Sequence, residues 1–183
     1  MSEVNNQKID EIIIIVRRWI SNVVIGLNLC PFSKPVYADN LIRYSVSLTS
    51  QPEEFLTLLE SEILLLTNSN PLEIETSLLI TPNLFKNFLD QNDFLDRVEH
   101  LLSHLKLDGI IQIANFHPEF QFANRNRDDI TNYVNRSPYP ILHLLREESI
   151  SRVVDLHPNI NSIYKNNKKT MRKLGYEGIR DLF

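Results

Sequence analysis

The sequence LIRYSVSLTSQPEEFLTLLESEILLLTNSNPLEIETSLLIT, residues 41–81, decides the fold. Apolar and polar side chains alternate over residues 41–48, which predicts a strand. Pro52 and the two acidic residues after it favour a helix start, and apolar residues recur at helical spacing to about Thr67. Residues 73–81 alternate again and predict a second strand. A strand, a helix and a strand in this order indicate a sheet covered by helices.

Helices and strands alternate over most of the remaining chain. Further helices are predicted for residues 9–27, from residue 82, from 92 or 93 to about 108, from 138 to about 156 and from 159 to 174, with a third strand over 110–116. The resulting order, α-β-α-β-α-α-β-loop-α-α, predicts an α/β fold, with an α+β fold as the alternative. We expect about three to five strands in one small sheet and a single compact domain, residues 1–183, in which residues 1–8 are flexible. The strand order stays open.

Composition counts against several classes of protein. The net charge of -4 and the pI of about 5.7 argue against a general nucleic-acid binder. A single cysteine, Cys30, cannot form an intrachain disulfide and suits a reducing, cytoplasmic setting. The apolar run Ile12–Val16 is short for an export signal, and no stretch approaches the length of a membrane span. We therefore expect a cytoplasmic protein without a membrane partner.

Residues 115–148 hold most of the candidate site. The middle of this stretch is polar and lacks apolar periodicity, as functional loops do. His143, Arg146 and Glu147 then follow at the spacing i, i+3 and i+4, so they share one face of the predicted helix. We expect His143 and Glu147 to be catalytic. The alternative is a solvated helix face on which these two side chains pair.

The start of the same predicted helix favours an anion site. Amides of a first helical turn are free, and the helix dipole is positive there. Arg136 directly precedes this helix and, with Arg146, can hold a carboxylate or phosphate. We assign Arg136, Arg146, Tyr139 and Asn135 to the binding of a small anionic substrate.

Two further residues complete the candidate site. His117 stands where the third predicted strand ends, a favoured position for site residues in α/β proteins, although its ring can instead bond to the backbone. Cys30 lies between a helix end and Pro31. It has three interpretations: a nucleophile with His117 or His143 as its base, a zinc or iron ligand together with these histidines, or a small buried apolar residue.

Several segments occur in a familiar combination. They are residues 24–32 (VIGLNLCPF), 116–118 (FHP) with 121–122 (QF), and 135–140 (NRSPYP) with 143–148 (HLLREE). The chain resembles the bacterial and plastid-lineage family catalogued as domain of unknown function 1415 (DUF1415) over about residues 10–182. Cys30, His117, Arg136 and His143 stand unchanged within these motifs, while the rest of the chain is richer in Ile and Asn than the family pattern. The resemblance implies a stand-alone, soluble domain and no particular reaction.

The favoured hypothesis is an enzyme with one Cys/His/Arg pocket that acts on a small anionic substrate. Its catalytic residues are Cys30, His117, His143 and Glu147. A first alternative places Zn or Fe on Cys30, His117 and His143. A second is a non-catalytic module that binds a small anion or a peptide, and a third gives the polar loop only a packing role. The sequence leaves open the reaction, the bound metal, the oligomeric state and whether Cys30, His117 and His143 share a pocket.

Overall fold

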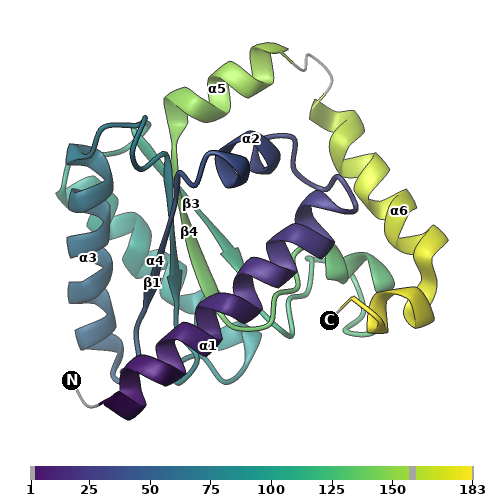
Figure 1. Cartoon of the computed structure of the whole chain (residues 1–183), viewed down its shortest axis with the longest axis horizontal. Helices are drawn as coiled ribbons and strands as arrows, with labels where there is room; N and C mark the ends of the chain where they lie inside the picture. The colour runs from purple at the N-terminus through teal and green to yellow at the C-terminus, as the bar shows by residue number, and fades with distance from the viewer. Residues whose placement is uncertain (1–2, 157–159, 183) are drawn as a thin grey trace.

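Four strands form one mixed sheet in the order β1-β2-β4-β3 (Figure 1). The computed structural model describes residues 3–156 and 160–182. The strands are β1 (Ile42–Val46), β2 (Thr76–Ile80), β3 (Ile111–Phe116) and β4 (Ile141–Arg146). β1 and β2 are parallel, because α3 (Pro52–Asn68) carries the chain back between them, and β4 runs antiparallel to both β2 and β3.

One face of the sheet is covered by α3 and α4 (Phe88–His104) (Figure 1). Pro52 occupies the first turn of α3 after the extended Gln51, and the side chain of Asn87 caps α4 by accepting the backbone N–H of Asp90. Apolar side chains of both helices pack on alternate residues of the central strands, among them Phe55, Leu59, Phe94, Leu79, Leu142 and Leu144.

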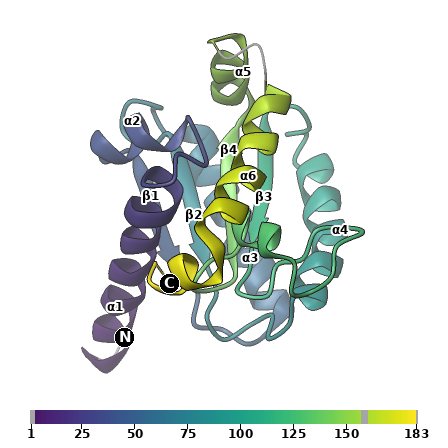
Figure 2. The same cartoon turned by 90° about the vertical axis from the view of Figure 1, so that its right-hand side faces the viewer.

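The opposite face is covered by the N-terminal and C-terminal helices. α1 (Glu3–Trp19) continues into a π-helix, η1 (Ile20–Ile25), and α2 (Ser33–Ala38) follows after a short loop. α6 (Ile160–Arg180) lies in front of β3 and β4 in Figure 2. It is kinked at Gly175, whose φ of 71° a residue with a side chain rarely adopts. Ile12, Val16, Trp19, Ile20 and Val23 recur at helical spacing along α1 and η1 and are buried in this second core.

The predicted fold class is confirmed, and the four strands fall within the expected range. The helix predicted from residue 138 to about 156 is wrong in its first half: residues 141–146 form β4, and α5 (Glu147–Leu156) begins only at Glu147. Periodicity alone cannot separate a short buried strand from a helix. Backbone pairing with β2 and β3 on both sides decides for the strand, in which Ile141, Leu142 and Leu144 are 0% exposed.

Smaller differences occur elsewhere. The helix predicted from residue 82 is absent from the described structure, where residues 81–87 form turns and bends, and α4 begins at Phe88 instead of 92 or 93. Residues 3–8, expected to be flexible, are the first residues of α1, and residues 1–2 lie outside the described structure. A 3-10 helix, η2 (Ile130–Val134), forms within the polar loop. No helix of the described residues is long and apolar enough to cross a membrane.

Candidate functional site

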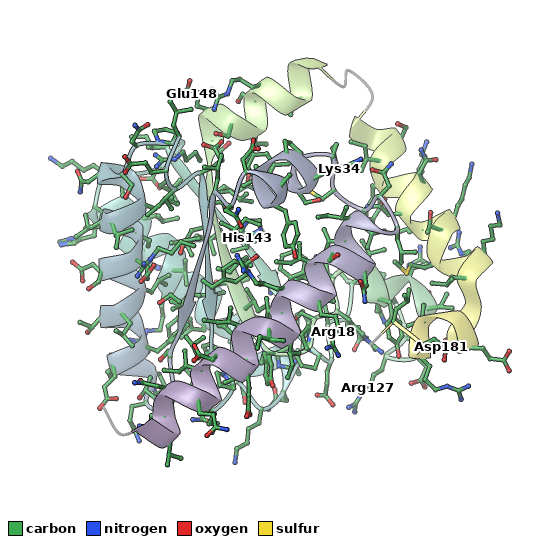
Figure 3. All side chains as sticks on the ribbon, in the orientation of Figure 1. Arg18, Lys34, Arg127, His143, Glu148 and Asp181 are labelled. Carbon is green, nitrogen blue, oxygen red and sulfur yellow. The ribbon has the colours of Figure 1, made fainter. Side chains whose placement is uncertain are left out.

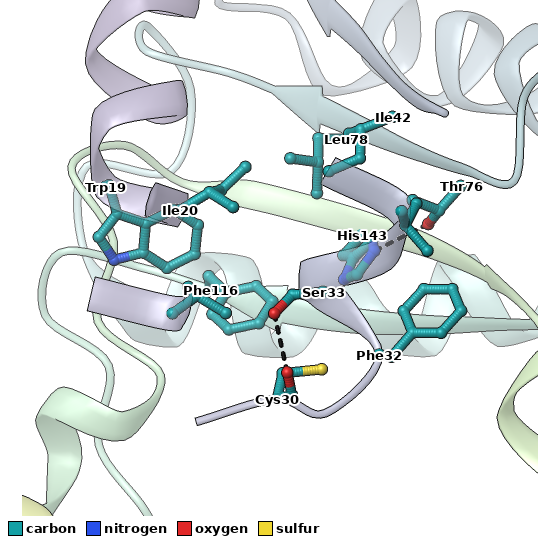
Figure 4. Close-up of a pocket in the computed structure, with 12 residues that line it drawn as sticks. Trp19, Ile20, Cys30, Phe32, Ser33, Ile42, Thr76, Leu78, Phe116 and His143 are labelled. Atoms are coloured by element: carbon teal, nitrogen blue, oxygen red, sulfur yellow. Dashed lines mark hydrogen bonds between the residues drawn. The ribbon is translucent and has the colours of Figure 1, made fainter. Parts of the chain in front are cut away.

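Two adjoining cavities lie between the sheet and the layer formed by α1, η1, α2, α5 and α6, and Figure 4 shows the inner one. The inner cavity measures about 70 Å³ and the outer one about 410 Å³. Cys30, Phe32, Phe116 and His143 line both. We call these two cavities together the Cys30–His143 pocket.

Cys30 reaches the pocket from the loop that joins η1 to α2. Its carbonyl accepts the hydroxyl of Ser33 at 2.8 Å and the backbone N–H of Ser33 at 3.3 Å, which fixes the turn at the start of α2. Burial raises the pKa of the Cys30 thiol, and hydrogen bonds from the backbone N–H groups of Phe32 and Ser33 oppose part of that rise. Cys30 is therefore a protonated thiol at neutral pH. An activated nucleophile or a metal ligand would instead be a thiolate.

His143 reaches the same pocket from the middle of β4. It pairs with Leu78 on one side and Ala114 on the other, and it lies near the middle of the molecule, whereas Arg127, Glu148 and Asp181 lie at its periphery (Figure 3). Burial lowers the pKa of His143 to about 4, so its ring is uncharged at neutral pH. Its Nε2 lies 2.8 Å from the hydroxyl oxygen of Thr76.

His117 does not line either cavity. It follows β3 directly, as expected, but its side chain is only 1% exposed and both ring nitrogens have partners. Nε2 lies 2.9 Å from the carbonyl oxygen of Phe85, and Nδ1 accepts the backbone N–H of Glu119 at 2.9 Å. Burial also lowers the pKa of His117. This is the backbone-bonded arrangement that the sequence left open, and the structure brings Cys30 together with His143 but not with His117.

The two arginines assigned to an anion lie outside the pocket as well. Arg146 donates to three carbonyl oxygens around the end of α3, those of Leu66 at 2.7 Å, Ser69 at 2.9 Å and Ile74 at 3.1 Å. On a strand, residues 143 and 146 point to opposite faces of the sheet, so the shared helical face predicted for them is wrong.

The side chain of Arg136 is also hydrogen-bonded to the backbone around it. Its guanidinium donates to the carbonyl oxygens of Arg127 at 2.7 Å and Phe120 at 3.4 Å, and it stacks over the ring of Tyr133 at 4.3 Å. No helix begins at residues 137–138, so the predicted helix N-terminus for an anion is wrong too. The expected anion site therefore has neither of its arginines nor its amides in the pocket.

The other three candidate residues lie in different parts of the structure. Asn135 lines the outer cavity. Tyr139 packs partly buried against the core beneath α1. Glu147 begins α5 and borders a separate hollow near Glu99 and Gln112, away from Cys30. Among the described residues, no group of three or more His, Cys, Asp or Glu side chains is placed to hold a metal ion.

Sequence reasoning missed several lining residues. Thr76 lines the inner cavity, and alternation over residues 73–81 puts it on the same strand face as Ile74, Leu78 and Ile80, so the one signal in the sequence is a hydroxyl among apolar side chains. Asn167 lines the outer cavity from α6 and donates to the carbonyl oxygen of Leu29 at 2.8 Å. Nothing in its sequence surroundings marks it, because its partner lies 138 residues away.

Comparison with known proteins gives a family match. The model of the family described as "Protein of unknown function (DUF1415)" matches residues 11–181. No curated protein and no solved structure matches the chain.

Proposed function

We propose a function for this chain, which belongs to the DUF1415 family: it binds a small, uncharged and largely apolar molecule in the Cys30–His143 pocket. One observation carries the proposal. Of the described residues that line the two cavities, none is Asp, Glu, Lys or Arg. The outer cavity, at about 410 Å³, is within the size range of small-molecule sites.

The lining argues for an uncharged ligand. An ion moved from water into such a pocket loses its hydration, and no opposite charge in the described lining replaces it. The thiol of Cys30 and the ring of His143 are both neutral at pH 7. Apolar and aromatic walls with a few polar groups are the usual composition of sites for uncharged molecules. This replaces the anionic ligand expected from the sequence.

The position of the family motifs supports the same pocket. Residues from three motif segments line it: Cys30 and Phe32 from the first, Phe116 from the second, and Asn135 and His143 from the third. These segments are far apart in the chain. One shared cavity explains their combination better than separate packing roles do.

The binding test uses N-phenyl-1-naphthylamine, an uncharged fluorophore whose emission rises in apolar surroundings. Ala114 lines the outer cavity beside His143, so Ala114→Leu fills space there. Ala123→Leu makes the same change on an exposed loop and serves as the control. We expect saturable binding to the wild type and to Ala123→Leu, and a loss of about tenfold or more in affinity for Ala114→Leu. Equal binding to both variants, or stabilisation by benzoate but by no uncharged compound, contradicts the proposal.

Thiol catalysis is the second candidate function. It is favoured by the two backbone N–H groups that reach the Cys30 sulfur and by a neutral imidazole in the same pocket. In such a reaction, the thiol proton passes to His143 while the sulfur bonds to an electrophilic carbon of the substrate and the leaving group departs.

Uncharged p-nitrophenyl acetate tests the catalytic candidate. Attack by Cys30 would form an acetyl thioester and release p-nitrophenol, so this candidate predicts a burst of one equivalent of p-nitrophenol per chain. Cys30→Ala should abolish the burst, and His143→Gln should slow it about a hundredfold. An unchanged burst rate in His143→Gln removes His143 as the base, and a missing burst in the wild type argues against a nucleophilic Cys30.

A further inference from the structure

Thr76 fixes the protonation of His143. The single hydroxyl proton of Thr76 is donated to the carbonyl oxygen of Leu144, 2.5 Å away. Two oxygens at this distance repel each other unless a proton lies between them. The same hydroxyl oxygen lies 2.8 Å from Nε2 of His143, so it can only accept there. The proton of the neutral ring is therefore on Nε2, and Nδ1 carries a lone pair.

The lone pair of Nδ1 faces the pocket. In Figure 4 the dashed line to Thr76 leaves one ring nitrogen, and the other lies on the side of the ring toward Ser33 and Cys30. No hydrogen bond joins Nδ1 to another residue in the described part of the chain, whereas the hydroxyl of Ser33 is already donated to the carbonyl of Cys30. His143 thus presents a hydrogen-bond acceptor to whatever occupies the cavity.

We propose that the ligand carries an uncharged hydroxyl or N–H group on an apolar body, and that this group donates a hydrogen bond to Nδ1 of His143. This inference rests on the proposed binding function and names the class of ligand. An apolar pocket that contains one oriented acceptor selects against molecules of the same shape that lack a donor, because their binding leaves the acceptor unpaired. A cationic donor is disfavoured, since no carboxylate stands in the described lining.

The first experiment measures the tautomer. In protein with ¹⁵N-labelled histidine, we expect Nε2 of His143 to show a protonated-nitrogen shift and Nδ1 an unprotonated one at pH 7. Thr76→Val keeps the shape of the side chain but removes the hydroxyl, so the two shifts should move toward an average of both tautomers. Thr76→Ser restores the hydroxyl and should restore the wild-type shifts. A protonated Nδ1 in the wild type would overturn the inference.

The second experiment compares p-cresol with p-xylene, which differ by a hydroxyl in place of a methyl group. Both dissociation constants are measured for the wild type and for His143→Leu, whose folding is checked by its thermal midpoint. We expect the ratio of the two constants to shift by about tenfold in favour of p-xylene when His143 is replaced. The comparison between proteins cancels the different water solubilities of the two compounds.

The outcomes separate the two proposals. An unchanged ratio in His143→Leu, with both compounds bound and competing with N-phenyl-1-naphthylamine, overturns the hydrogen bond to Nδ1 and leaves the pocket standing as a binding site. If p-cresol, p-xylene and the fluorophore all fail to bind, the binding function itself is overturned, and the named ligand class with it.

Discussion

Cys30 is a protonated thiol in an apolar loop, and its reactivity follows from that state. Because burial raises the pKa of the thiol, little thiolate is present at pH 7. We expect iodoacetamide to alkylate Cys30 in the ligand-free protein several-fold more slowly than it alkylates glutathione at pH 7. The alkylation rate of Cys30 should rise at alkaline pH, where thiolate forms. Cys30→Ser gives the background. A rate at pH 7 equal to or above that of glutathione would show an activated thiol instead.

His143 makes stability depend on pH in a definite direction. The folded pKa of about 4 is below the ordinary value of 6.5, so the unfolded chain binds a proton at this site as pH falls below 6.5 while the folded chain does not. Folded stability is therefore lost from pH 6.5 downward, until the folded ring also titrates near pH 4. We expect the wild type to lose up to about 3 kcal/mol relative to His143→Gln across this window. Urea unfolding at several pH values measures it, and parallel pH curves for the two proteins would contradict it.

At the same scale, the sequence singled out two residues that the structure places in one pocket. Cys30 and His143 were both candidates, and they share a pocket. His117 was an equal candidate, but its ring bonds to the carbonyl of Phe85, 32 residues away, and no spacing rule reports such a contact. The use of a histidine is set by what surrounds both ring nitrogens, and this depends on the tertiary fold.

Among the elements, β4 is where local pattern and tertiary context disagree. Residues 141–146, ILHLLR, contain apolar runs that fit a helix as well as a strand. The strand wins because β2 and β3 supply backbone partners on both sides, and an isolated pattern cannot show these. The strand–helix–strand unit of residues 41–81 was predictable, because its strand alternation and its helix start are both local signals.

Arg146 shows what the end of β4 contributes to neighbouring elements. Its guanidinium satisfies three carbonyls where α3 ends and the chain turns toward β2. We expect Arg146→Met to lower the free energy of unfolding by about 2–3 kcal/mol, because three charge-assisted hydrogen bonds to partly buried carbonyl oxygens are lost. Arg97→Met is the control, since Arg97 pairs with the exposed carboxylate of Glu53, lies over the ring of Phe94 at 5.2 Å, and should change stability by no more than about 1 kcal/mol. Equal losses in urea unfolding would show that Arg146 is no more than a surface cation.

Over the whole molecule, the sheet separates two cores of different character. The core beneath α3 and α4 is bordered by the hollow beside Glu147, whereas the layer of α1, α2 and α6 leaves the larger Cys30–His143 pocket open against the sheet. The sequence predicted the layers through helical stripes and strand alternation. It could not predict the cavity, because a void depends on how side chains from η1, α2, α6 and the sheet fail to meet.

Because the Cys30–His143 pocket lies on one face of the sheet, a bound ligand should slow local unfolding mainly in the segments that cover that face. A molecule in the outer cavity contacts Ile163, Tyr164 and Asn167 of α6 and the turn at Cys30, so it stabilises the docking of these segments on the sheet. We expect p-cresol at saturation to slow amide hydrogen exchange about tenfold or more in α2 and the first half of α6. Exchange in α3 should change little, because α3 lies on the other face of the sheet. Hydrogen exchange with mass spectrometry distinguishes the two layers, and protection confined to α3 and α4 would place the ligand on the wrong side of the sheet for the Cys30–His143 pocket.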